Sequence, residues 1–421
     1  MRVAHILRKY DPTEWGGTET AIHLLTTGLK ANAVESVVYA PRIDKKVTAL
    51  DPLAEAGCAV RNFNARVPIW GISPERKRQM IAVGGNVISL DLLGALWSEH
   101  GLDVIHSHAL GRLGAIAHTV ARSRRKPFVL SVHGGAYDLP ANVRAELRKP
   151  LSDGGFDWGK PLGFLLRARH LFSNADAIVT CNPREAELIR ERHPDRRVMV
   201  QPHGVPAAKF AHDHRTSALA AFPMIEGRQV LLMPGRIDPV KNQDFLVAQM
   251  AALAQRHPCA LLVLAGPVTD QAYGEALQAR IEREGLQQKV LLAGRLPTGD
   301  ARLIGLLQEA RAVLLPSLSE TFGLVILEAW AAGTPAISSR TSGATALIED
   351  DRNGYLFDLE RPAGFHAAID RVLSDERHGL ALGAAGRARV IADFDVTVLA
   401  ARMSRLYGEL IEEKNALRHS A

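Results

Sequence analysis

The chain has 421 residues, a length that predicts two or three domains, each large enough to bury its own core. Apolar residues make up 47% and charged residues 23%, which excludes disordered and fibrous classes. No apolar run approaches a membrane span, and the opening MRVAHIL is too short for a secretory signal. Three widely spaced cysteines, Cys58, Cys181 and Cys259, favour a reducing compartment, so we predict a cytoplasmic protein.

The net charge of +6 is unevenly distributed along the chain. Residues 1–205 carry a net charge of +8 and the remainder carries −2. A basic first half predicts contact with something anionic: either lipid at the inner face of a membrane or an anionic small-molecule acceptor. We expect no nucleic-acid partner, because no recognition motif or aromatic platform accompanies the charge.

Short apolar strands alternate with helices through the first half. Strands are predicted at 3–7, 35–39, 59–62, 104–106, 128–132, 177–180 and 198–201, and helices at 19–29, 90–99, 114–121 and 164–172. This alternation predicts a parallel sheet covered on both faces. Gly16 and Gly17 separate the first strand from the first helix, where a ligand can approach the backbone or a turn can simply pack. The aperiodic segment 134–163 follows a strand end and is predicted to be an acceptor-binding loop.

A second alternating series follows an irregular stretch at 202–227, which we predict to be a domain boundary. Strands are predicted at 229–233, 260–265, 290–293, 312–315, 336–338 and 354–357, and helices at 245–255, 273–284, 301–309 and 322–332. The tail, 396–414, is predicted to be a helix with a single apolar stripe, which must lie on another part of the protein.

The residues that can carry chemistry follow two strands of the second series. Arg236 and Lys241 come after one strand, and together they suit the oxygens of a diphosphate, although solvated surface charges are the alternative. Glu320 and Glu328 lie in the loop and helix after the other strand. The N–H groups at a helix start favour an anion, so we predict a site for a ligand with phosphate and hydroxyl groups.

These motifs together resemble a known family. The sequence GRIDPVKN at 235–242, followed by SETFGLVILEAWAAGTP with Glu320 and Glu328 eight residues apart, resembles the retaining, family 4-like glycosyltransferases of GT-B fold with a Glu-x7-Glu motif. VIHSH at 104–108, VHGG at 132–135, HGV at 203–205 and NGYLF at 353–357 extend the resemblance over nearly the whole chain.

The resemblance implies an α/β protein with two Rossmann-like domains facing across a cleft. Residues 1–205 would form the acceptor-binding domain and 206–393 the nucleotide-sugar-binding domain. Residues 394–421 would form a helix that crosses back onto the first domain.

It also implies roles for particular residues. Arg236 and Lys241 would bind the diphosphate of a UDP- or GDP-sugar, Glu320 the sugar hydroxyls and Glu328 the ribose. His133 would contact the sugar near the reacting carbon, unless it is a core histidine satisfied by hydrogen bonds. The backbone amides that would close around phosphate and sugar are those of Gly17, Thr321, Phe322, Gly323 and Leu324.

The implied reaction is transfer of a hexose, with retention, to a hydroxyl of a glycan, a lipid-linked glycan or a small molecule. The catalytic residues would be His133, Glu320, Arg236 and Lys241, and the departing phosphate oxygen would take the acceptor proton. We expect no cofactor and no metal, because the pair His106 and His108, like His212 and His214, lacks a third ligand. The alternatives are a sugar-nucleotide epimerase of similar fold and a non-catalytic sugar-nucleotide-binding partner.

Overall fold

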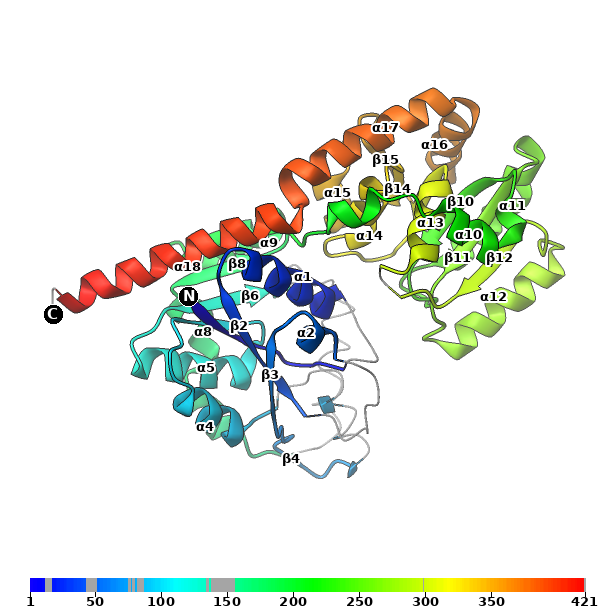
Figure 1. Ribbon diagram of the computed structural model, residues 1–421. Helices are drawn as coiled ribbons and strands as arrows, with labels where there is room; N and C mark the ends of the chain where they lie inside the picture. The colour runs from blue at the N-terminus through cyan, green and yellow to red at the C-terminus, as the bar shows by residue number, and fades with distance from the viewer. Residues whose placement is uncertain are drawn as a thin grey trace. The chain divides into compact units, whose positions relative to one another are not determined.

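The computed structural model describes residues 1–11, 17–42, 51–74, 77, 80–81, 87–133, 136–137, 156–297 and 299–419. These residues form two compact units (Figure 1). Unit 1 consists of Met1–His203 together with Val396–Ala421, and unit 2 consists of Gly204–Asp395. Within the part of the chain that is described, no helix combines the length and apolarity needed to span a bilayer.

Unit 1 contains a seven-stranded parallel sheet with the order β3-β2-β1-β5-β6-β8-β9. Its strands are β1 (Arg2–Ile6), β2 (Glu35–Pro41), β3 (Ala59–Phe63), β5 (Val104–Ser107), β6 (Phe128–Val132), β8 (Ala177–Thr180) and β9 (Arg197–Val200). The central strands are short apolar runs buried at nearly every position, as expected for a sheet covered on both faces. The strand order reverses between β1 and β5, and ligands of open α/β sheets collect at the carboxyl ends of strands at such a point.

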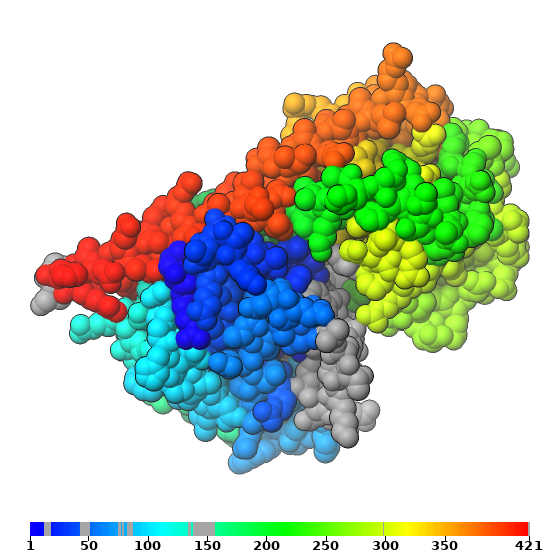
Figure 2. All heavy atoms as spheres, in the orientation of Figure 1, coloured from blue at the N-terminus to red at the C-terminus, as the bar shows by residue number. Residues whose placement is uncertain are grey.

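Helices cover both faces of this sheet. They are α1 (Gly17–Ala31), α2 (Pro52–Glu55), α4 (Leu90–Ser98), α5 (Gly111–Ser123), α7 (Lys160–Leu165), α8 (Leu171–Asn174), α9 (Pro183–Arg192) and α18 (Val396–His419). On one face, α1 and α18 bury Leu29, Met403 and Leu406 against Val3 and Val104 (Figure 1). The apolar stripe of the tail helix therefore lies on unit 1, and Figure 2 shows the red α18 against the blue N-terminal segment.

The predicted helix at 164–172 is wrong. The chain forms α7, a 3-10 turn at Ala168–His170 and then α8. Arg167 adopts a φ of 54°, a left-handed conformation that L residues rarely take, and this breaks the helix. Of the predicted loop 134–163, residues 134–135 and 138–155 lie outside the described residues. A short antiparallel pair joins β4 (Ile69–Trp70) to β7 (Phe156–Asp157).

Unit 2 contains a six-stranded parallel sheet with the order β12-β11-β10-β13-β14-β15. Its strands are β10 (Gln229–Pro234), β11 (Ala260–Ala265), β12 (Val290–Gly294), β13 (Ala312–Leu315), β14 (Ala336–Ser339) and β15 (Gly354–Phe357). The order reverses between β10 and β13. Each unit is thus a parallel sheet with helices, which confirms the predicted α/β class with two Rossmann-like domains.

The helices of unit 2 include several that the sequence did not predict. They are α10 (Arg215–Ala221), α11 (Gln243–Arg256), α12 (Gln271–Arg283), α13 (Ala301–Glu309), α14 (Leu324–Ala331), α15 (Ser342–Leu347), α16 (Pro362–Ser374) and α17 (Glu376–Arg389). Among the described residues, the helices that the sequence did not predict are α2 and α9 in unit 1 and α10, α15, α16 and α17 in unit 2. The predicted irregular stretch 202–227 is also wrong in part, because it contains α10, which packs on α13 and buries Ala218. Gly305 makes this packing close, since a Cβ there would lie 2.2 Å from the carbonyl oxygen of His214.

Candidate active site

The side chains predicted to bind the donor follow the two strands between which the order of unit 2 reverses. Arg236 and Lys241 lie in the loop after β10, and Glu320 lies in the loop after β13. Because β10 and β13 are parallel neighbours, their carboxyl ends share one edge of the sheet, and both loops leave from it.

Lys241 and Glu320 form an ion pair across these loops. The Nζ atom of Lys241 donates to Oε2 of Glu320 over 2.6 Å, and the two side chains are 17% and 24% exposed. The resemblance assigned both residues to a ligand and did not predict that they would bind each other. In the structure each charge neutralises the other, so an anionic ligand that binds Lys241 competes with Glu320 for its charge.

Asp238, which sequence reasoning missed, organises the loop after β10. Its Oδ1 accepts the backbone N–H of Lys241 over 3.0 Å, and its Oδ2 lies 3.1 Å from Nη2 of Arg236. Arg236 itself is 59% exposed. Asp238 therefore holds the exposed guanidinium of Arg236 and the backbone at Lys241 in one short loop. Its position between two cations was the available signal in the sequence.

The loop after β13 is held by two glycines. Gly323, the residue before α14, has a φ of +90°, which favours glycine. Gly343 donates its N–H to the carbonyl oxygen of Glu320 over 2.9 Å, and a Cβ on it would lie 2.6 Å from the backbone nitrogen of Phe322. The connection that includes Thr321 is thereby fixed, and it leads into Leu324, the first residue of α14.

Glu328 lies one turn into α14 and is half-buried. Among the described residues its carboxylate has no hydrogen-bond or ion-pair partner, and burial raises its pKa from 4.5 to about 7. A buried carboxylate without a partner is costly, so the position favours a ligand that donates hydrogen bonds.

In unit 1, His133 follows β6 at the carboxyl edge of the sheet. Its Nε2 lies 2.7 Å from Nδ1 of His108, and its ring stacks on His203 with centroids 5.4 Å apart. Burial, His203 and Arg8 lower the pKa of His133 well below 6.5, so the ring is neutral near pH 7. The predicted Gly17 begins α1, and Gly16 lies outside the described residues.

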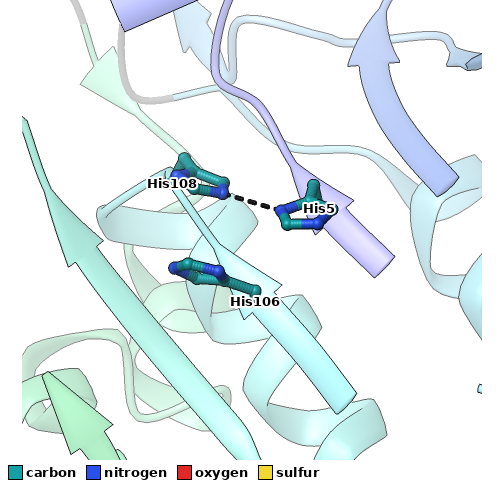
Figure 3. Close-up of side chains that lie close together, drawn as sticks. All are labelled: His5, His106 and His108. Carbon is teal, nitrogen blue, oxygen red and sulfur yellow. Dashed lines mark hydrogen bonds between the residues drawn. The ribbon is translucent and has the colours of Figure 1, made fainter. Parts of the chain in front are cut away.

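The argument that His106 and His108 lack a third partner is wrong, because His5 on the neighbouring strand joins them (Figure 3). The three buried side chains offer nitrogen atoms within 4.8 Å of one another. Hydrogen bonds already occupy most of these atoms. Nδ1 of His106 bonds the hydroxyl of Tyr407 at 2.6 Å, and Nε2 bonds Oγ of Ser131 at 2.7 Å.

Comparison with known proteins identifies the class. Residues 217–389 match the family described as glycosyl transferases group 1, and residues 16–204 match the glycosyl transferase 4-like domain. The chain belongs to this glycosyltransferase family, and its units are those of the GT-B fold. This confirms the predicted resemblance to family 4-like glycosyltransferases of GT-B fold.

Particular relatives and structures are similar to it. The D-inositol 3-phosphate glycosyltransferase of Nocardioides sp. is 30% identical over 366 residues, which cover 82% of this chain and 76% of the relative. The protein of the same name from Streptomyces scabiei is 30% identical, covering 86% and 78%. The structure of HepE from Anabaena in complex with UDP has a TM-score of 0.71 at 17% identity, covering 97% and 100%. Sucrose-phosphate synthase from Thermosynechococcus elongatus has a TM-score of 0.70 at 21% identity, covering 98% and 99%.

Proposed function

We propose that this glycosyltransferase moves a hexose from a UDP-sugar to a hydroxyl of an anionic polyol acceptor, with retention of the anomeric configuration. The observation that carries the proposal is the Lys241–Glu320 ion pair at the carboxyl edge of the unit 2 sheet. Relatives named D-inositol 3-phosphate glycosyltransferase support a phosphorylated acceptor, and HepE structures with UDP and UDP-glucose support UDP as the nucleotide.

In the proposed donor site, the two partners of the ion pair exchange each other for groups of the donor. The diphosphate of the donor takes Lys241 and the exposed guanidinium of Arg236, since phosphate offers more acceptor oxygens than one carboxylate. Glu320, now released, accepts hydrogen bonds from the sugar hydroxyls, and Glu328 accepts them from the ribose. The backbone amides at the start of α14 add the positive end of a helix dipole.

In the proposed reaction the bond from the anomeric carbon to the phosphate oxygen breaks as the acceptor hydroxyl approaches. The negative charge that grows on the diphosphate is stabilised by Arg236 and Lys241. The departing phosphate oxygen takes the acceptor proton, so no general base from the protein is needed. Two fixed cations supply the charge stabilisation that a metal would otherwise supply, and we therefore propose a reaction without metal.

The first test is thermal stabilisation of the protein by UDP, GDP and their sugar conjugates in buffer with a chelator. A ligand that binds the folded state raises the melting temperature, and we expect UDP-sugars to do so. Lys241→Ala should abolish the shift, whereas the control Lys289→Ala, which removes an ammonium group that donates to the Pro258 carbonyl, should keep it. If GDP-sugars alone stabilise the protein, the UDP assignment is wrong. If no nucleotide does, the donor site is wrong.

A second test separates transfer from the alternatives. The protein is incubated with the UDP-sugar that binds and with inositol phosphate, and the product is followed by NMR. Retention appears as the donor's anomeric configuration in the product. Conversion of the sugar nucleotide without acceptor would indicate an epimerase, and binding without any turnover would indicate a non-catalytic partner. Transfer only to glycans or lipid-linked acceptors would show that the assignment of an anionic polyol as the acceptor is wrong.

We also propose that unit 1 contacts an anionic membrane at its cytoplasmic face. An exposed aromatic patch lies on and after β4 and β7, where Trp70 is 63%, Phe156 65% and Trp158 39% exposed. The ring of Trp70 lies 6.0 Å from that of Phe156 and 6.5 Å from that of Trp158. The exposed Lys160 follows this patch in the chain. Exposed aromatic and basic side chains together are typical of a surface that rests on anionic lipid.

Co-sedimentation with vesicles tests this contact. Binding to vesicles with anionic phospholipid should exceed binding to neutral vesicles, and should fall at high salt. Phe156→Ser should weaken it, while Leu380→Ser, which changes an apolar residue of unit 2 that is 61% exposed against 65% for Phe156, should not. Equal binding of both variants, or none by the wild type, would remove the membrane proposal.

A further inference from the structure

Histidines of unit 1 form a hydrogen-bonded chain that runs from the interior to the carboxyl edge of the sheet. His5 lies on β1, His108 follows β5 and His133 follows β6. Nδ1 of His5 is 3.1 Å from Nε2 of His108, a bond drawn in Figure 3. Nδ1 of His108 is in turn 2.7 Å from Nε2 of His133. The first two rings are buried, and His133 is half-buried.

All three rings are neutral near pH 7. Burial lowers the pKa of His5 to about 3, and burial with the neighbouring histidines lowers the pKa of His108 well below 6.5, as it does for His133. A neutral imidazole has one N–H and one bare nitrogen. Each bond in the chain therefore has one donor, and the choice of donor at one end determines every proton position along it.

The inner end of the chain selects the direction. Nε2 of His5 is buried and has no hydrogen-bond partner among the described residues. If the protons were on Nε2 of each ring, this atom would be a buried N–H without an acceptor. If the ring protons are on Nδ1, Nε2 of His5 is only an unused acceptor. Folded proteins tolerate an unused acceptor more often than an N–H without an acceptor. The unpaired Nε2 of His5 therefore favours protons on Nδ1, with His5 donating to His108 and His108 donating to His133.

A metal ion at the same cluster would require these bonds to break. Tyr407 and Ser131 occupy both nitrogens of His106, and the chain occupies both nitrogens of His108. Of the six nitrogens of His5, His106 and His108, Nε2 of His5 alone has no partner within the described part of the chain. The cluster is thus already satisfied as a hydrogen-bond network.

We propose that His5 and His108 are positioning residues that hold His133 in the tautomer with its proton on Nδ1, so that His133 presents an N–H at the carboxyl edge of the unit 1 sheet to a phosphate oxygen of a substrate. Nε2 of His133 is engaged by His108, and its Nδ1 has no hydrogen-bond partner among the described residues. An oxygen of a phosphate accepts and never donates, so only this tautomer can bind it. The choice of ligand rests on the proposed function, whereas the tautomer does not.

Long-range proton–nitrogen NMR of the histidine-labelled protein tests the tautomer directly in the free chain. Single histidine variants assign the ring signals. We expect the proton on Nδ1 in His5, His108 and His133. A proton on Nε2 of His133, or stoichiometric metal in the purified protein with histidine signals that change on its removal, would overturn the proposal.

A matched pair of variants tests the effect on activity. His5→Asn keeps an N–H near the position of Nδ1, while His5→Asp offers only acceptor atoms and should reverse the chain. The Asp variant should move the His133 proton to Nε2 and lower kcat/KM about tenfold or more, the factor expected from a lost hydrogen bond to a charged group. The Asn variant should keep the tautomer and stay within about threefold of wild type.

Tyr407→Phe is the control for disturbance of the cluster. It removes the hydroxyl that bonds His106 and leaves the chain untouched, so the His133 tautomer and kcat/KM should not change. If His5→Asp does not fold, the NMR spectrum of the wild-type protein still shows which nitrogen of His133 carries the proton. Turnover of sugar nucleotides with the His133 proton on Nε2 overturns the positioning role and spares the proposed function. An Nδ1 proton in a protein that binds no phosphorylated substrate overturns the ligand named here together with that function.

Discussion

At the scale of single residues, two carboxylates of unit 2 differ in what they contact. Glu320 lies against Lys241, 79 residues away in the chain. Its carboxylate therefore has a counter-ion even when no ligand is bound. Glu328 is half-buried with no partner among the described residues, and burial raises its pKa to about 7. Glu320 therefore already has a cation as its partner, whereas Glu328 has no partner among the described residues.

Removing the charge of Glu320 should separate binding of the nucleotide from transfer of the sugar. In Glu320→Gln, Lys241 has no competing carboxylate, so UDP should bind about threefold to tenfold more tightly, as expected for an ion pair of about 1 kcal/mol. Turnover of the UDP-sugar should fall, because the amide is a weaker partner for the sugar hydroxyls. Isothermal titration and initial rates measure the two effects. Weaker UDP binding in this variant would contradict the competition.

Glu328 should make stability depend on pH in a defined direction. Because its folded pKa of about 7 exceeds the ordinary 4.5, the folded state holds its proton over that range and the unfolded state does not. Stability is therefore lost as pH rises from about 4.5 to 7, by up to about 3 kcal/mol. Glu328→Gln should melt at a similar temperature to wild type at pH 5 and at a higher one at pH 8. A constant difference across this range would show that Glu328 is not the group responsible.

At the scale of elements, the loop between β13 and α14 depends on its neighbour α15. Gly343 in α15 binds the Glu320 carbonyl and approaches Phe322 so closely that a side chain must displace the backbone. The N-terminal part of α14, where the amides predicted to contact the donor lie, is thus positioned by tertiary contact and by the left-handed Gly323.

Gly343→Ala should weaken UDP binding and destabilise the protein by about 1–3 kcal/mol, the usual range for overpacking. The control is Gly408→Ala in α18, where a Cβ meets nothing within 4 Å. Alanine there should stabilise by up to about 1 kcal/mol, since glycine is a poor helix former, and should not change UDP binding. Thermal melts with and without UDP give both quantities. Unchanged UDP affinity in Gly343→Ala would mean that this loop does not form the donor site.

At the scale of the whole molecule, the chain ends in the unit in which it begins. Helix α18 buries Met403, Leu406 and Leu410 with residues of β1 and β5, although unit 2 separates these segments in sequence. Unit 1 therefore needs the C-terminal helix for its core, whereas the core and the proposed donor residues of unit 2 lie within Gly204–Asp395.

Leu406→Ala should destabilise unit 1 by about 2–5 kcal/mol, the cost of removing a buried leucine side chain. In calorimetry a transition of unit 1 should move to lower temperature, and the transition that UDP shifts should remain. Leu417→Ala, on the same helix but 65% exposed, should have little effect. Loss of UDP binding in Leu406→Ala at temperatures where the protein is folded would contradict independent donor binding by unit 2.

Local patterns predicted the buried elements well and the surface elements poorly. The strands at 128–132, 260–265 and 312–315 have the predicted bounds, because a central parallel strand is a short continuous apolar run. The helix at 164–172 failed because Arg167 breaks it and because Phe164 and Leu165, before the break, are 84% and 76% exposed. Helix α16 went unpredicted although its buried residues, from Phe365 to Leu373, have the spacing of an amphipathic helix. Helix α17 went unpredicted because three of its four buried residues are glycines, which give no apolar pattern.

By itself, the sequence determined the fold class, the family and the loops in which the candidate donor residues lie, because apolar periodicity and motifs are local properties of the chain. Only the tertiary structure decided that Lys241 binds Glu320, that Asp238 holds the loop after β10, and that His5 joins His108 and His133. These partners come from different strands and loops, and they meet because parallel strands bring their carboxyl ends to one edge. The distance between two residues in the sequence does not show whether they meet at that edge, because this depends on the order of the strands in the sheet.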